Sequence, residues 1–334
     1  MTQVLPHQAT VMSEPPHSAS SVNPASANPI RRKLGQSDLR VFPLAIGGNV
    51  FGWTADSEAT VDILDTYFEH GGNFVDTADS YAGGRSEIMI GNWMRERHNR
   101  AQMVIGTKIG KSADSPGVTA SAIYRAVNSS LERLGTDYID LLYLHIDDES
   151  VPFEETLLVV DDLIRSGRVR YFGASDHSSN RLIEARVIAA QLGVTPMVAL
   201  QNHYNLAHRR EFEGDLANVA AQQRLGVMPR FALAGGFLTG KYRTKADLGH
   251  NSRSGEAGRY LNKRGLRILG ALDRVAGQQQ ISVATTALAW LLSKPNIVAP
   301  VASASLERQV HDLVAAASVQ LSRHQVAELD RASA

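Results

Sequence analysis

The chain has 334 residues, of which 34 are lysine or arginine, 34 are aspartate or glutamate, and none is cysteine. This balance leaves no overall field to attract nucleic acid or anionic lipid, so a small molecule is the expected partner and protein partners stay open. Without cysteine there is no disulfide, thiolate nucleophile or cysteine-based zinc site, which predicts a cytoplasmic protein. No uncharged apolar run reaches about 20 residues, so no membrane insertion is expected.

At the amino end, residues 1–28 are rich in serine, proline, alanine and histidine and lack the sustained apolar run of a secretory signal. This composition predicts a disordered tail. Residues 29–334 are expected to form a single domain. Within it, residues 30–44 predict a small β-hairpin, which turns at 35–37 and plugs the amino-terminal end of the fold that follows.

Eight short apolar or β-branched runs come next, and each predicts a strand. They cover residues 44–47, 73–76, 103–107, 138–145, 169–175, 197–202, 226–233 and 296–303. Amphipathic helical patterns lie between them. Ser57 and Glu58 are predicted to open the first helix, and Gly71 and Gly72 to close it.

The later helices are also predicted to end at glycine residues. They are predicted over residues 119–134 and 153–166, with Gly135 and Gly167 as stops, and a fifth helix stops at Gly193. The order strand, helix, glycine, strand is typical of right-handed parallel crossovers, and eight of them close a (β/α)8 barrel of the TIM type. A doubly wound dinucleotide-binding sheet is disfavoured, because the first turn reads GGNVFG and lacks the Gly-x-Gly-x-x-Gly spacing.

Catalytic groups in such a barrel come from the carboxyl ends of the strands and from the loops after them. Asp76, Lys108 and His145 end or follow the second, third and fourth predicted strands, and Tyr81 lies in the loop after Asp76. Taken singly, each has an ordinary structural explanation as a turn, packing or hydrogen-bonded core residue. Taken together, they predict one site.

The chemistry of this set is specific. A phenol titrates near pH 10, so it is a poor acid at neutral pH unless its phenolate is stabilised. A lysine ammonium in contact supplies that stabilisation, an aspartate holds the ammonium charged, and a histidine donates to an oxygen that gains negative charge. Such a set suits the protonation of an oxyanion formed when hydride reaches a carbonyl. Because no side chain delivers hydride, a nicotinamide cofactor is expected.

Several longer motifs occur in an order typical of one family. They are NFVDTADSYAGGRSE, VIGTKIG, SLERLGTDYIDLLYLH, GRVRYFGASD, LQNHYNL, LAGGFLTGKYR and VASASLERQ. With them the chain resembles the aldo-keto reductases over residues 32–333, in the long-chain branch that includes the potassium-channel beta subunits. The resemblance implies a (β/α)8 barrel, NADP(H) at its carboxyl end, and reduction of an aldehyde or ketone to an alcohol. It makes Asp76, Tyr81, Lys108 and His145 catalytic, with Tyr81 as the general acid.

The resemblance also supplies cofactor-binding positions. Ser175 and Gln201 match residues that hydrogen-bond the nicotinamide carboxamide. Two further sets match the pyrophosphate and adenosine sites, namely Phe231, Ala232, Leu233, Ala234 and Lys241, and Ser303, Ser305, Gln309 and Asp312. The second set lies at the start of the last barrel helix, where an anion is favoured. Arg253 and Arg308 are candidates to bind a 2′-phosphate, although each is explained equally well as a solvated surface arginine.

Three residues depart from the family pattern. Arg230 replaces an aromatic ring that packs against the nicotinamide, and its charge is predicted to disfavour the oxidised, cationic ring, which favours carbonyl reduction. Asp176 replaces a common asparagine and so lacks an amide donor to the carboxamide. Leu313 replaces a frequent adenine-binding asparagine. Both of the last two changes are expected to weaken cofactor binding.

The substrate pocket is the least specified part of the site. Gly48, Asn49 and Trp53 after the first strand, and Ile146 beside His145, are its expected lining. The long segment 241–265 is expected to fold over the cofactor or substrate, since loops of this length are seldom passive in a compact domain. No metal ligand set is predicted.

Two other functions stay open. A cofactor-binding regulatory subunit, like the potassium-channel beta subunits, would share the barrel and act through protein contacts. A metal-dependent barrel hydrolase is disfavoured, because such enzymes pair histidines near strand ends, whereas His145, His177 and His203 are isolated in the sequence.

Overall fold

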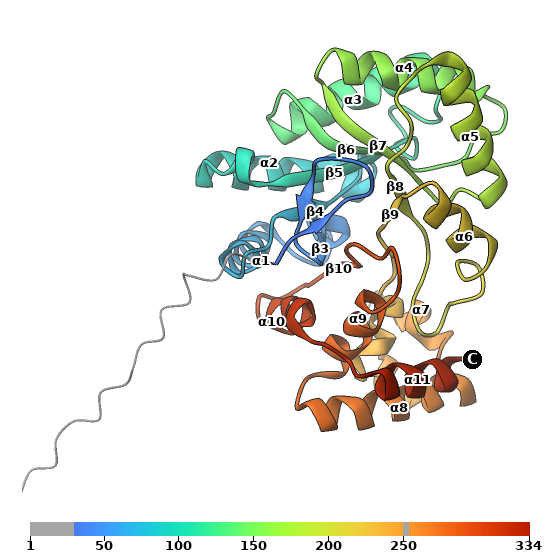
Figure 1. Ribbon diagram of the computed structural model, residues 1–334. Coiled ribbons are helices and arrows are strands. Elements are labelled where there is room, and N and C mark those ends of the chain that lie inside the picture. The colour runs from blue at the N-terminus through green and yellow to red at the C-terminus, as the bar shows by residue number, and fades with distance from the viewer. Residues whose placement is uncertain (1–29, 250–253) are drawn as a thin grey trace, which may run out of the picture.

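The computed structural model describes residues 30–249 and 254–334, so the predicted tail over residues 1–28 and Arg253 lie outside the described residues (Figure 1). Within them, eight parallel strands stand side by side in chain order, and the last lies beside the first. They are β3 (Ala45–Gly47), β4 (Phe74–Asp76), β5 (Val104–Ile109), β6 (Ile139–Leu144), β7 (Val169–Ser175), β8 (Ala199–Gln201), β9 (Gly226–Val227) and β10 (Val301–Ala302). Val227 bonds to Asn296 and Val298, which joins β9 to the chain leading into β10. The predicted (β/α)8 barrel is confirmed.

Helices surround the strands, as Figure 1 shows. They are α1 (Ser57–Glu69), α2 (Arg85–Arg97), α3 (Ala120–Leu134), α4 (Phe153–Arg165), α5 (Ser179–Leu192), α6 (Asp215–Gln222), α7 (Ser254–Gly258), α8 (Lys263–Gln279), α9 (Val283–Leu292), α10 (Arg308–Ala315) and α11 (Arg323–Ser333). The last of them, α11, packs against α8 (Figure 1). Among the described helices, none has both the length and the apolar character needed to cross a bilayer.

Local chemistry sets the helix ends much as predicted. Thr119 caps α3 by accepting from the amide of Ala122, and Gly135 ends it with a φ of 60°. Gly193 ends α5 in the same left-handed conformation. Helix α1 begins at Ser57 with Glu58 in its first turn, as predicted, and the residue before it, Asp56, is the cap, which accepts from the amide of Ala59 at 3.0 Å.

A hairpin plugs the amino-terminal end of the barrel, as predicted. Its antiparallel strands are β1 (Arg32–Lys33) and β2 (Arg40–Val41). The buried side chains of Leu34 and Leu39 join a core cluster with Phe74 and Leu141, which come from barrel strands. Hydrophobic burial at this end supports the barrel and leaves the opposite end for chemistry.

Two predicted strands are much shorter than expected. The strand predicted over 226–233 ends at Val227, because Pro229 lacks an amide hydrogen and Phe231 and Ala234 take positive φ values of 53° and 51°. The strand predicted over 296–303 is reduced to β10, which follows Pro300. After β9, Arg230 still forms a parallel bridge with His203, and beyond it the chain turns into a loop at the carboxyl end of the barrel. The second strand is shortened mainly at its start, before Val301.

Candidate active site

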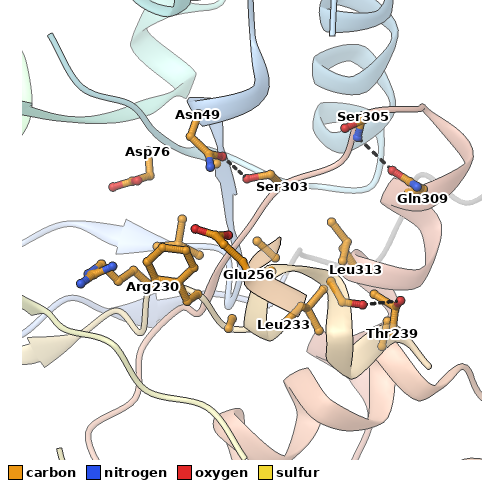
Figure 2. A pocket seen from close by; sticks show the side chains of 18 of the residues that line it. Asn49, Asp76, Arg230, Leu233, Thr239, Glu256, Ser303, Ser305, Gln309 and Leu313 are labelled. Carbon is orange, nitrogen blue, oxygen red and sulfur yellow. Dashed lines mark hydrogen bonds between the residues drawn. The ribbon is translucent and has the colours of Figure 1, made fainter. Parts of the chain in front are cut away.

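A cavity of about 690 Å³ opens at the carboxyl ends of the strands. Residues at or just after the ends of successive strands line it, including Gly47, Asp76, Lys111, His145, Asp176, Gln201, Arg230 and Ser303. Figure 2 shows its two ends, with Asp76 and Arg230 at one and Ser305, Gln309 and Leu313 at the other. The parallel register brings these side chains together, because all strands finish at the same rim.

Asp76, Lys108 and Tyr81 form one buried constellation. Lys108 Nζ donates to Asp76 Oδ2 at 2.5 Å and to the carbonyl of Thr77 at 2.9 Å, and it lies 3.4 Å from the Tyr81 hydroxyl. Only 1% of the Lys108 side chain and 2% of that of Asp76 are exposed. Burial disfavours the ammonium, but Asp76 and Tyr81 favour it more, so the pKa of Lys108 is raised above its usual value.

His145 completes this end of the cavity. Its ring stands edge-on to that of Tyr81, with centroids 6.1 Å apart, and its Nδ1 has no hydrogen-bond partner among the described residues. Burial first, and then the positive charges of Lys108, Lys111 and Arg230, lower the pKa of His145 to about 2. The imidazole is therefore neutral at physiological pH, and a neutral ring has one N–H donor and one acceptor nitrogen.

Gln201 and Ser175 end neighbouring strands but differ in their contacts. Gln201 lines the cavity, and its Nε2 donates to Asp76 Oδ1 at 2.8 Å. The carboxylate of Asp76 is thus bonded on both oxygens, by Lys108 and by this amide. Ser175 is fully buried behind the lining, and its Oγ lacks a partner within the described part of the chain.

Two of the departures from the family pattern contact each other. Arg230 Nε donates to Asp176 Oδ1 at 2.9 Å, and the guanidinium also lies over the ring of Phe231, 4.7 Å from its centroid. Asp176 adopts a left-handed backbone with a φ of 59°, which asparagine and aspartate tolerate best. The prediction that Arg230 disfavours an oxidised nicotinamide treats this residue as a lone cation. Because Asp176 offsets that charge, the premise of the prediction is weakened.

The segment after β9 forms a floor of tight turns. It is the 3-10 element η4 (Ala234–Thr239), in which Gly235 and Gly236 have φ values of 64° and 91°. A Cβ on Gly236 would lie 3.3 Å from Lys241 Cε, and one on Gly235 would lie 3.0 Å from Glu256 Cβ. Glycine therefore lets the backbone approach both charged side chains closely.

The other end of the cavity is built around the start of α10. Gln309 Oε1 accepts from the amides of Ser305 and Leu306, and Ser303 Oγ donates to Asn49 Oδ1 at 2.5 Å (Figure 2). These contacts hold the loop between β10 and α10 against the loop after β3.

Most of the residues predicted to bind the cofactor or the substrate line the cavity. Asn49 and Trp53 line the cavity, as do Phe231, Ala232, Leu233, Lys241, Ser303, Ser305, Gln309 and Asp312. Gly48, Ile146, Ala234 and Arg308 do not. Gly48 is buried behind the wall, where its carbonyl accepts from Ser86, and Ile146 borders a separate small hollow beside His177.

Sequence reasoning missed five polar residues of the lining, which are Ser80, Lys111, Thr239, Glu256 and Ser282. Ser80 precedes Tyr81 in the loop after β4, and Lys111 follows β5, the strand that carries Lys108, so the strand-end rule could have included both. Glu256 lies in α7, within the long segment expected to fold over the site, but no local signal singles it out. Ser282 precedes α9, far from any strand end in the sequence.

Most of this chain is similar in sequence to known proteins of one family. The family model described as the aldo/keto reductase family matches residues 43–334. The chain is 31% identical over 311 residues to norsolorinic acid reductase of Aspergillus flavus, covering 88% of this chain and 78% of that protein. It is 30% identical over 318 residues to an aryl-alcohol dehydrogenase of Phanerodontia chrysosporium whose name specifies NADP(+), with coverages of 86% and 81%. It is also 33% identical over 299 residues to a probable voltage-gated potassium channel subunit beta of Arabidopsis thaliana, with coverages of 86% and 91%.

Proposed function

Because this chain belongs to the aldo/keto reductase family and is an oxidoreductase of that type, we propose that it uses NADPH to reduce an aldehyde or ketone to an alcohol, with Tyr81 as the proton donor. The observation that carries the proposal is the contact of Lys108 Nζ with Asp76 at 2.5 Å and with the Tyr81 hydroxyl at 3.4 Å, at the end of a large cavity.

The proposed proton transfer rests on this contact. Tyr81 gives its hydroxyl proton to the substrate oxygen, and the ammonium of Lys108 stabilises the phenolate that remains. Asp76 keeps Lys108 charged and fixes its direction, since both side chains are almost fully buried. The chain would therefore supply a proton at the point where negative charge develops.

His145 has a supporting role in the proposal. Its depressed pKa keeps the ring neutral, so it adds a hydrogen-bond donor without adding another positive charge beside Lys108. A donor aimed at the carbonyl oxygen would polarise the bond before reduction and stabilise the oxygen during it.

The residues that line the cavity fit an elongated nicotinamide dinucleotide. When bound, this cofactor supplies the hydride that side chains cannot supply. Gln201 and the unpaired hydroxyl of Ser175 are the candidates to hold its carboxamide, although Ser175 lies behind the lining. Lys241 offers a cation for the pyrophosphate beside a floor of glycine turns, and Ser305, Gln309 and Asp312 lie at the far end for the adenosine.

The preference for NADPH over NADH has a separate basis. Arg253 lies outside the described residues, and Arg308 does not line the cavity. Support comes from the family resemblance and from the NADP(+) in the name of the P. chrysosporium relative. Binding constants for both reduced cofactors, measured with wild type and with Arg253→Ala, test this part of the proposal.

The central experiment follows NADPH consumption with a panel of aldehydes and ketones. We expect Tyr81→Phe to lower kcat by about 100-fold or more, because general acid catalysis contributes about 10²- to 10⁴-fold. Binding of NADPH, followed by its fluorescence, should change little, which separates loss of chemistry from loss of fold. Equal kcat values for both proteins would remove Tyr81 as the acid.

A regulatory subunit is the second candidate. The similarity to a probable potassium channel subunit beta, which extends over 91% of that relative, favours it. A stable complex with a membrane protein partner, seen by size measurement, together with negligible turnover across the carbonyl panel, would support this function over the first.

A further inference from the structure

Lys111 is a lining residue that the proposed chemistry does not use. It follows β5 after Gly110, whose φ of 111° turns the chain at the rim of the barrel. Lys111 lines the same cavity as Tyr81 and His145, and it remains exposed to solvent. Among the described residues it forms no hydrogen bond or ion pair.

The other charges at this end of the cavity are compensated. Lys108 pairs with Asp76 at 2.5 Å, and Arg230 pairs with Asp176 at 2.9 Å. Asp76 and Arg230 lie at the same end of the pocket in Figure 2. His145, which lines the same cavity, is neutral. Asp176 also attracts the ammonium of Lys111, but it is paired with Arg230, so the two cations share one carboxylate and one positive charge is left uncompensated beside the reacting groups.

Charges farther along the cavity do not cancel this one. Lys241 and Glu256, which carry opposite charges, lie against the adjacent glycines Gly236 and Gly235. Asp312 lies at the far end, with Ser305 and Gln309. The uncompensated charge thus belongs to the end where His145 and Tyr81 meet.

We infer that the preferred carbonyl substrate carries a carboxylate, which Lys111 binds while the carbonyl lies between Tyr81 and His145. This inference rests on the proposed reductase function and adds the substrate class to it. A carboxylate is the complementary group, because an ammonium that donates to it forms a charge-assisted hydrogen bond. We expect this bond to give a preference of about 10- to 100-fold over an uncharged analogue.

The experiment compares 4-carboxybenzaldehyde with its methyl ester, which has nearly the same shape without the charge. For wild type, the carboxylate should bind at least 10-fold more tightly by calorimetry, and its kcat/KM should be higher by a similar factor. Lys111→Gln should bring the ratio close to one. Lys111→Glu should favour an aldehyde with a trimethylammonium group in place of the carboxylate.

The control is Lys33→Glu, which makes the same charge change on an exposed lysine of β1, at the opposite end of the barrel. It should leave the carboxylate preference intact. A wild-type ratio near one, or a preference that survives Lys111→Glu, overturns the inference. If only the proposed function is wrong, the result differs: the protein would still bind the carboxylate more tightly than the ester in a way that depends on Lys111, but it would reduce no aldehyde.

Discussion

At the scale of single residues, Asp79 is a buried carboxyl that the proposed chemistry does not use. It lies two residues before Tyr81 and is only 2% exposed. Burial, with repulsion from Glu87, raises its pKa to about 6 from 3.8. Above pH 6 the group is ionised in the folded and unfolded protein alike, and the folded state carries the desolvation penalty. Below about pH 4 it is protonated in both states, and the penalty vanishes.

Asp79→Asn should therefore stabilise the protein at neutral pH. The raised pKa of Asp79 corresponds to a gain of about 3 kcal/mol in the free energy of unfolding at pH 7–8, which declines towards zero near pH 4. Denaturant midpoints measured across this pH range test it. Asp62→Asn, at an exposed position of α1, is the control and should change little. A gain that is the same at pH 4 and pH 8 would contradict the explanation.

At the scale of elements, the loop after β4 positions Tyr81 over Lys108. Ala82, Gly83 and Gly84 take φ values of 51°, 65° and 84°, so three successive left-handed residues turn the chain directly into α2. A Cβ on Gly83 would have no neighbour within 4 Å, whereas one on Gly84 would lie 2.7 Å from Arg133 Cδ. Substitutions at these two neighbouring glycines therefore distinguish the cost of backbone strain from the cost of a steric clash.

Gly83→Ala should cost about 1 kcal/mol of stability from backbone strain and leave kcat nearly unchanged. Gly84→Ala should cost more, because Arg133 must also move, and Arg133 bonds Glu87 at 2.7 Å. We expect it to lower kcat/KM as well, since Tyr81 begins the same short element. Thermal unfolding and kinetics of both variants test this, and equal losses would show that the contact with Arg133 has no effect.

At the scale of the whole molecule, the two ends of the barrel have different tasks. The hairpin end holds a buried cluster that includes Leu39, which is 3% exposed, while the cavity lies at the other end. Leu39→Ala should lower the free energy of unfolding by about 2–5 kcal/mol. Its kcat/KM below the melting temperature should equal that of wild type. Leu266→Ala, at an exposed position of α8, is the control and should change neither quantity appreciably.

A structural feature of this protein could be predicted from the sequence where it depends on residues that are neighbours along the chain. Strand and helix patterns, capping residues and closing glycines involve neighbours in the sequence, so the barrel, the hairpin plug and the order of Asp76, Tyr81, Lys108 and His145 could be predicted. Pro229 and Pro300 can also be read in the sequence. The lengths of β9 and β10, however, depend on the neighbouring loops, whose positive φ values the sequence pattern does not reveal.

The alternation that closes a barrel, and the strand ends that carry its polar residues, can be derived from the residues alone, because both follow from periodicity and chain direction. The fold alone sets which charges meet. It paired Arg230 with Asp176 across 54 positions of the chain and joined Asp76 to both Lys108 and Gln201, while Lys111 kept no such partner among the described residues. Electrostatic energy depends on distance and burial in space, and neither is fixed by the separation of two residues along the chain.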